Sequence, residues 1–274
     1  MNILALSGLS APTIVMLQLI LGLSAIASGL SGFGFSAIGA ICLWLLPPTL
    51  AVPLLMALSS ANQMMSLRQI RADMKPFRQW WPDGPAPFIV GGVAGVPIGL
   101  WLLHSLPTPV LMAIFGAFLV VYAAYSIVTP ANRRALTGGW AISVLVGMSG
   151  GIIGGFTAFP GAAVVVWVGR RGLPKEESRA IVQPYIFAMQ FVSLALLAAR
   201  QPATFNAGFW SLFAMTVVVV LPCTLLGVYI YKSLSDVNFR RISFSLLGTS
   251  GVAIFTKGVC GLGIATGLLS VMAH

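Results

Sequence analysis

Charged residues are scarce in this 274-residue chain, and their scarcity decides the environment in which it can fold. Only 7% of its residues are charged, whereas 58% are hydrophobic, and the mean hydropathy is +0.98. A soluble domain keeps about a quarter of its residues charged to cover its surface. The composition therefore excludes a soluble globular protein. It predicts an all-α integral membrane protein with the lipid bilayer as its surroundings.

Acidic residues are rarer still, and none of them falls within an apolar segment. Cation transporters and carboxylate proton relays normally keep Asp or Glu inside the membrane, because a charge there is costly and is retained for the translocation route. Their absence favours an anionic or neutral substrate. The acidic residues of the chain are Asp73, Asp83, Glu176, Glu177 and Asp236.

Cysteine and histidine are also sparse. Cys42, Cys223 and Cys260 are scattered through apolar runs without metal-ligand spacing, and the two histidines are His104 and His274. We therefore expect packing roles for the cysteines, no metal site and no cofactor. The net charge of +10 comes from basic residues in short clusters between apolar segments, which indicates membrane topology and no nucleic-acid partner.

What the sequence does contain is a series of apolar segments, most of them long enough to cross a bilayer. The segments 34–47, 140–154 and 156–168 are too short to cross comfortably, which is typical of helices that break inside the membrane or of re-entrant hairpins. We predict 10–11 transmembrane or half-spanning helices. They are expected near residues 12–30, 34–47, 50–67, 86–106, 109–128, 140–154, 156–168, 180–199, 208–232, 239–256 and 258–272.

Lys and Arg residues follow the third, fifth, seventh and ninth of these segments. Short cytoplasmic loops collect positive charge, so a chain that starts outside would place all four clusters in the cytoplasm. We expect a multi-pass protein of a bacterial inner membrane, and an N-terminus that is retained because it lacks the basic front end of a signal peptide. His104, Arg200 and Lys257 fall on the outer side. For Arg200 and Lys257 we favour interface anchoring over attraction of a substrate.

The two halves of the chain carry related sequences. Gly99–Leu106 lines up with Gly227–Leu234. Five segments per copy is an odd number, so the second copy would cross the membrane upside down relative to the first. We therefore predict two inverted five-segment repeats, 1–137 and 138–274, in a single membrane domain. Such repeats place the substrate of many secondary transporters near the midplane between them.

Each copy interrupts its first long apolar stretch with glycines, in Gly29–Ala37 and in Gly150–Gly161. Inside a membrane, a break is tolerated where the freed backbone groups meet protein, ligand or trapped water. A helix that restarts after Gly34 or Gly155 would offer backbone amides and the positive end of its dipole to an anion. The alternative role of these glycines is close packing between helices.

Hydroxyl and amide side chains complete the predicted site. Ser36 and Thr157 would stand in the first turn of the restarting helices, and Gln63 and Gln190 occupy corresponding places in the two copies. Hydrogen bonding between helices is the alternative for the amides, including Asn62 and Gln183. The candidate substrate-binding residues are Gly32, Gly34, Phe35, Ser36, Gln63, Gly154, Gly155, Thr157, Pro160 and Gln190.

The glycine-broken first hairpin, the stretch Gly154–Gly161 with its Pro160, the Arg171–Glu176 loop and the tandem architecture together resemble the TauE/SafE sulfite exporter family. The resemblance covers nearly the whole chain. It implies transport of sulfite, sulfonates or related organosulfur anions across a bacterial inner membrane, in either direction. The first copy departs from the usual family pattern because Phe33 and Phe35 are interleaved with its glycines.

The predicted function is secondary transport of a small sulfur-containing anion by alternating access, without enzymatic activity. A homodimer is possible. A passive anion channel shares the same composition. An intramembrane serine hydrolase is a further alternative, because Gly147–Gly151 has the Gly-x-Ser-x-Gly spacing around Ser149, although neither histidine offers an evident base.

Overall fold

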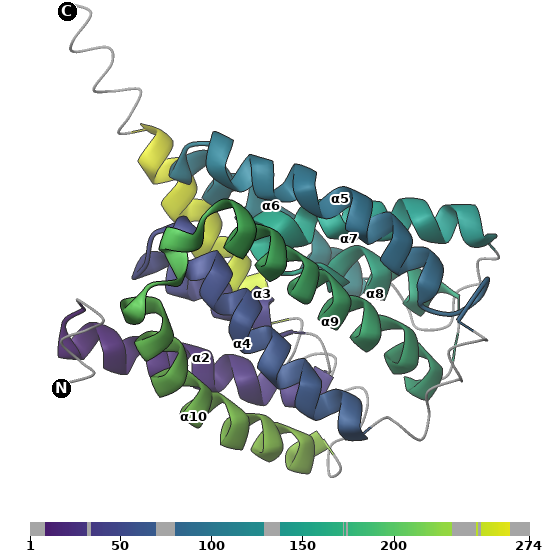
Figure 1. The fold of residues 1–274 in the computed structure, drawn as a ribbon, viewed down its shortest axis with the longest axis horizontal. Helices are drawn as coiled ribbons and strands as arrows, with labels where there is room; N and C mark the ends of the chain where they lie inside the picture. The colour runs from purple at the N-terminus through teal and green to yellow at the C-terminus, as the bar shows by residue number, and fades with distance from the viewer. Residues whose placement is uncertain are drawn as a thin grey trace, which may run out of the picture.

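The computed structural model of the chain is a bundle of helices (Figure 1). It describes residues 9–31, 34–69, 80–128, 138–171, 173, 175–231, 245 and 248–263. No strand occurs in these ranges, so the prediction of an all-α fold is confirmed. The labelled helices are α2 (Ala11–Ser31), α3 (Phe35–Gly39), η1 (Ala40–Trp44), α4 (Pro48–Gln69), α5 (Ala86–Ser105), α6 (Thr108–Val128), α7 (Trp140–Thr157), α8 (Gly161–Arg170), α9 (Lys175–Arg200), η3 (Pro202–Phe205) and α10 (Ala207–Tyr231). Residues 248–263 form a further helix.

Most of the predicted segments agree with these helices to within a few residues. Six of the described helices are long and apolar enough to cross a membrane. Two predictions of segment length are wrong. Residues 140–154 are part of the 18-residue helix α7, which is long enough to cross. The predicted interruption between 256 and 258 is absent, because the helix 248–263 continues through Lys257.

Two short apolar helices follow long ones, as the short segments predicted. Phe35–Trp44, made of α3 and η1, directly follows the break after α2, and Gly161–Arg170 is α8. Ten residues of α-helix rise about 15 Å, which is about half of the hydrocarbon thickness of a bilayer. The first residues of both short helices, Phe35 and Gly161, are buried, so each short helix begins within the bundle.

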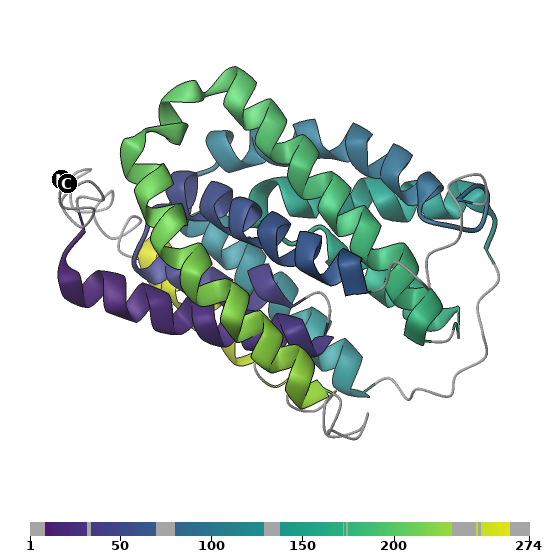
Figure 2. The same cartoon turned by 60° about the horizontal axis from the view of Figure 1, so that its bottom comes forward.

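Glycines allow close packing between helices from the two halves of the sequence. A Cβ atom added at Gly95 of α5 would lie 2.2 Å from the carbonyl oxygen of Met148 in α7, and one added at Gly227 of α10 would lie 2.1 Å from that of Ile26 in α2. Only glycine permits so close an approach of two backbones. The pairs α5–α7 and α2–α10 are thus tightly packed, and Figures 1 and 2 show α2 beside α10.

The two pairs occupy equivalent places when the chain is divided into its predicted halves. In each pair, the first long helix of one half packs on the helix that precedes the last helix of the other half. The pair α2–α10 also contacts α4, the pair α5–α7 also contacts α9, and α4 packs against α9. The inverted orientation of the halves and the boundary between 137 and 138 stay predictions.

Polar contacts place several helix ends at one end of the bundle. Arg179 in the first turns of α9 donates to the carbonyl oxygen of Leu30 at the end of α2 (3.0 Å). Arg171, just after α8, lies 3.7 Å from Asp83, which precedes α5. Both arginines belong to the predicted cytoplasmic cluster that follows segment 156–168. The contacts show that they lie where α2 and α8 end and where α5 and α9 begin.

Candidate functional site

The first break lies between α2 and α3. Gly34 precedes α3, whose first residue is Phe35, and the amide of Ile38 donates to the carbonyl oxygen of Gly34 (3.2 Å). The hydroxyl of Ser24 in α2 donates to the carbonyl oxygen of Phe35. The hydroxyl of Ser250, in the helix 248–263, donates to the Ala37 carbonyl oxygen of α3 (3.3 Å). Gly32 lies outside the described residues.

Ser36 is the candidate residue with the most distinctive environment. Its side chain is 1% exposed, and its Oγ has no hydrogen-bond partner among the described residues. It stands in the first turn of α3, as the sequence predicted. The amides of a helix's first turn have no acceptor within that helix. A buried hydroxyl without a partner therefore lies beside backbone donors at the first break.

The second break lies at Ala158–Pro160 and not at Gly155. The backbone of Ala158 is left-handed, with φ 59° and ψ 17°, and α8 begins at Gly161. The predicted restart of a helix after Gly155 is therefore wrong, since α7 continues to Thr157. The left-handed residue is what turns the chain, because a right-handed one would extend α7.

Thr157 is the last residue of α7, so its predicted position in the first turn of a restarting helix is also wrong. Its hydroxyl donates to the carbonyl oxygen of Ile153 (2.6 Å) and accepts from the amide of Phe159 (3.1 Å). The hydroxyl hydrogen is thus already engaged. In this structure Thr157 caps the end of α7 and shapes the break.

The glycines of α7 have two different roles. A Cβ atom at Gly154 would lie 2.5 Å from the Cβ of Pro160, so this glycine lets the break fold back against α7. A Cβ atom at Gly155 would lie 2.7 Å from the Cα of Gly99 in α5. Gly155 is therefore a packing residue between two helices, the alternative that the sequence left open.

Gln190 of α9 reaches the second break directly. Its Nε2 donates to the carbonyl oxygen of Ala158 (2.7 Å), and its Oε1 has no hydrogen-bond partner in the described part of the chain. Gln63 is equally buried in α4, which packs against α9. Asn62 donates to Ser28 of α2 (2.7 Å). Interhelical hydrogen bonding, the alternative for the amides, is thus observed for Asn62 and Gln190.

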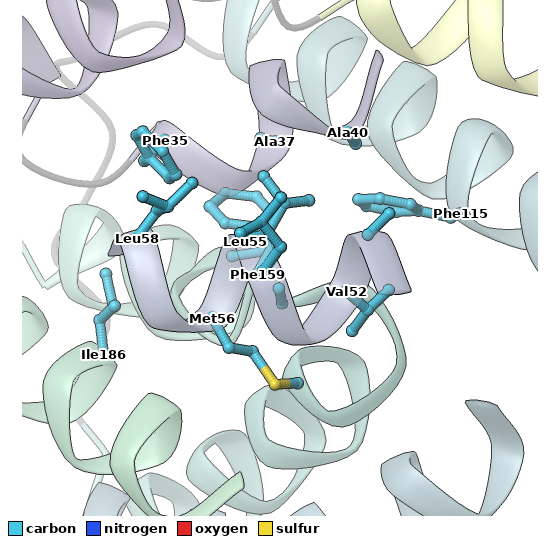
Figure 3. Packing of buried hydrophobic residues seen from close by; sticks show 14 of the residues in the cluster. Phe35, Ala37, Ala40, Val52, Leu55, Met56, Leu58, Phe115, Phe159 and Ile186 are labelled. Carbon is cyan, nitrogen blue, oxygen red and sulfur yellow. The ribbon is translucent and has the colours of Figure 1, made fainter. Parts of the chain in front are cut away.

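The two breaks approach one buried apolar cluster. Phe35 and Ala37 of α3, Leu55 of α4 and Phe159 of the second break belong to it, and each is at most 1% exposed. Figure 3 shows these side chains gathered around α4. Phe159 also packs edge-on against Tyr122 of α6, with ring centroids 6.1 Å apart. Apolar side chains therefore close the centre of the bundle in this conformation.

Three residues outside the predicted site support these elements. The Nζ of Lys257 donates to the carbonyl oxygens of Leu43 and Trp44 at the end of η1 (3.1 Å each) and lies 5.0 Å from the Trp44 ring centroid. The hydroxyl of Tyr185 donates to the Gly147 carbonyl oxygen (2.7 Å). Ala158 supplies the left-handed turn. Of the three, only Lys257 stood out in the sequence, as a charge outside the loop clusters.

Ser149 and His104, which bear on the hydrolase alternative, are engaged with their own helices. The Ser149 hydroxyl is exposed on α7 and donates to the carbonyl oxygen of Val146 (2.8 Å). The His104 Nδ1 lies 2.8 Å from the carbonyl oxygen of Leu100 at the end of α5. This contact joins the His104 side chain to the preceding turn at the end of α5.

The family comparison covers both breaks and most of both halves. A family model described as "Sulfite exporter TauE/SafE" matches residues 17–254. No curated protein and no solved structure matches the chain. The match includes most of α2, the helices from α3 through α10 and part of the helix 248–263. The chain therefore belongs to the TauE/SafE sulfite exporter family of membrane proteins.

Proposed function

We propose that this protein is a secondary transporter of sulfite or organosulfonate-type anions, which bind between the two helix breaks and cross the membrane by alternating access. The observation that carries the proposal is the Ser36 hydroxyl, which is buried and without a partner in the described residues. A buried polar group without a hydrogen bond costs about 1–3 kcal/mol. An oxyanion beside it would accept that hydrogen bond.

The backbone around Ser36 adds donors of the same kind. The amides of residues 35–37 form the first turn of α3, where the partial positive charge of the helix dipole lies. Gly34 leaves room for a ligand to approach this backbone. Phe35 has its side chain in the apolar cluster, so it contributes its amide.

At the second break, the proposed donors are the first-turn amides of α8, at residues 161–163. They replace the amides of Gly155–Ala158 that the sequence suggested, because α7 continues to Thr157. Gln190 fixes the Ala158 carbonyl, and Gly154 with Pro160 sets the fold of the break. Gly32 and Gln63 stay predicted contributors from the first half.

Alternating access requires the apolar cluster to open. The glycine pairs α5–α7 and α2–α10 each contain one helix from either half of the sequence, so the halves cannot separate without breaking them. We therefore expect the moving bodies to be α2, α4 and α10 on one side and α5, α7 and α9 on the other. Their main contact is between α4 and α9, the helices that carry the buried Gln63 and Gln190.

The test is sulfite binding and uptake by Ser36→Ala protein in proteoliposomes. Loss of a hydrogen bond to a charged ligand costs about 1.5–3 kcal/mol, so we expect affinity to fall at least about tenfold. Ser143→Ala is the matched control, because Ser143 is also buried but lies in the first turn of α7, away from the break. Equal affinities of wild type and Ser36→Ala would contradict the site.

Two further measurements separate the alternatives. Sulfite trapped inside the vesicles should accelerate uptake of labelled sulfite by a carrier, whereas a passive channel would show no such counterflow. Ser149→Ala should leave transport unchanged. Loss of transport in that variant would contradict this expectation and support the serine hydrolase alternative, which requires Ser149.

A further inference from the structure

Beside the second break, α6, α7 and α8 enclose an apolar groove of about 260 Å³. Phe118 and Tyr122 of α6, Val146 of α7 and Val166 and Trp167 of α8 line it, together with two alanines of α8. Nearly all of its accessible lining is apolar. An anionic substrate would lose its hydration there without gaining donors, so the groove does not suit the transported anion.

One end of this groove carries hydrogen-bond donors. The indole Nε1 of Trp167 and the Nε of Arg170 are buried and have no hydrogen-bond partner among the described residues. The two residues are three apart on α8, so they share one side of the helix. The Nη1 of Arg170 also donates to the hydroxyl of Tyr125 in α6 (3.2 Å), which leaves that hydroxyl's hydrogen available to another acceptor.

The groove and the donors are continuous. Arg170 lies one turn beyond Val166 on α8, and Tyr125 lies about one turn beyond Tyr122 on α6, so the Arg170–Tyr125 pair lies just beyond the lining at one end of the groove. That end belongs to the basic side of the bundle, where Arg171 and Arg179 also lie. Clustered basic residues are typical of the cytoplasmic side of a membrane protein, so this end of the groove is predicted to face the cytoplasmic leaflet, which holds anionic lipids.

We propose that this groove is a binding site for an anionic phospholipid, with an acyl chain along α6, α7 and α8 and the phosphate against Arg170, Tyr125 and Trp167. The apolar walls match the chain, and the arginine matches the phosphate in charge and in hydrogen-bonding geometry. Tryptophan at this level of a membrane helix presents its ring to the chains and its N–H to the headgroups. Its phosphate-binding end, at Arg170, lies at the end of α8 opposite to the proposed substrate donors at residues 161–163.

The test is lipid binding to the purified full-length protein, measured by native mass spectrometry with phosphatidylglycerol and phosphatidylcholine of identical acyl chains. We expect wild-type protein to bind phosphatidylglycerol about fivefold more tightly, the effect of one basic residue near anionic headgroups. Arg170→Gln should remove that preference and Arg170→Lys should retain part of it. Arg200→Gln is the control, because Arg200 is exposed at the end of α9.

A second pair of variants tests the acyl chain. Ala163→Leu fills the groove and should weaken binding of both lipids, whereas Ala141→Leu on the exposed surface of α7 should not. An unchanged preference in Arg170→Gln, or an equal loss in Arg200→Gln, would overturn the proposal. If inorganic phosphate displaced phosphatidylglycerol at an equal concentration, the groove would not be a lipid site. Loss of a dimer in Ala163→Leu would instead make the groove a contact between two copies.

Discussion

Gln190 of α9 holds the carbonyl oxygen of Ala158, with 2.7 Å between its Nε2 and that oxygen. Ala158 is the left-handed residue that ends α7 and turns the chain toward α8. The contact joins residues 32 apart in sequence and is fully buried. A side chain on one helix thus fixes the shape of a break in another, which gives Gln190 a structural role whether or not it touches the substrate.

Replacing Gln190 by Leu should lower the free energy of unfolding by about 0.6–2 kcal/mol, because the Ala158 carbonyl would lose its partner inside the bundle. Thermal unfolding in detergent measures the effect. Gln183→Leu is the matched control on the same helix, where the buried Oε1 has no partner among the described residues, so this change should be neutral or stabilising. Equal losses in both variants would contradict a specific role for Gln190.

Adding a methyl group at Gly99 should prevent normal folding, because the new Cβ would lie 2.1 Å from the carbonyl oxygen of Ile152. The amount of monodisperse protein extracted from membranes measures this. Gly169→Ala should fold normally, since nothing lies within 4 Å of a Cβ at that position. Gly155→Ala should behave like Gly99→Ala. If Gly155→Ala protein unfolded at the wild-type temperature but no longer bound sulfite, Gly155 would belong to the binding site and not to the helix packing.

Lys257→Met should destabilise the protein by about 1–3 kcal/mol while leaving sulfite affinity unchanged. The ammonium group donates to two carbonyl oxygens at the end of η1 and lies over the Trp44 ring, contacts that methionine cannot make. Unfolding and binding are measured on the same preparation. A stable variant with weakened sulfite binding would restore the alternative in which Lys257 attracts the substrate.

Ala158→Gly should be tolerated and raise the free energy of unfolding by up to about 1 kcal/mol. A left-handed backbone costs a residue with a Cβ about 1–2 kcal/mol, and the greater flexibility of unfolded glycine offsets about half of the gain. Ala188→Gly within α9 should instead destabilise by about 1 kcal/mol. Thermal unfolding measures both variants. If both lowered the unfolding temperature, the break would not require the left-handed turn.

Much of the fold followed from hydropathy alone. The short segments 34–47 and 156–168 predicted helices that break inside the membrane or re-entrant hairpins, and the structure has short apolar helices there, α3 with η1 and α8. The position of Ser36 in the first turn of α3 was also predicted correctly. These features depend on neighbouring residues, whose polarity and helix preference can be read without knowing the rest of the chain.

The candidate site was predicted less well because its residues depend on distant backbone. Gly154 and Gly155 are adjacent and chemically identical, yet one faces Pro160 and the other faces Gly99. Thr157 was predicted as a free donor, and its hydroxyl is held by Ile153. Nothing near these residues in the sequence distinguishes packing from binding, since the distinction lies in the atoms that approach them.

The sequence by itself determined that the chain lies in a membrane, where its long helices run and roughly where two of them break, because the cost of polar groups in lipid constrains each segment independently. Only the tertiary structure decided that α5 pairs with α7 and α2 with α10, that Ala158 turns the chain and that Lys257 caps η1. Those features arise from contacts between residues far apart in the chain, and such contacts exist only once the helices are packed.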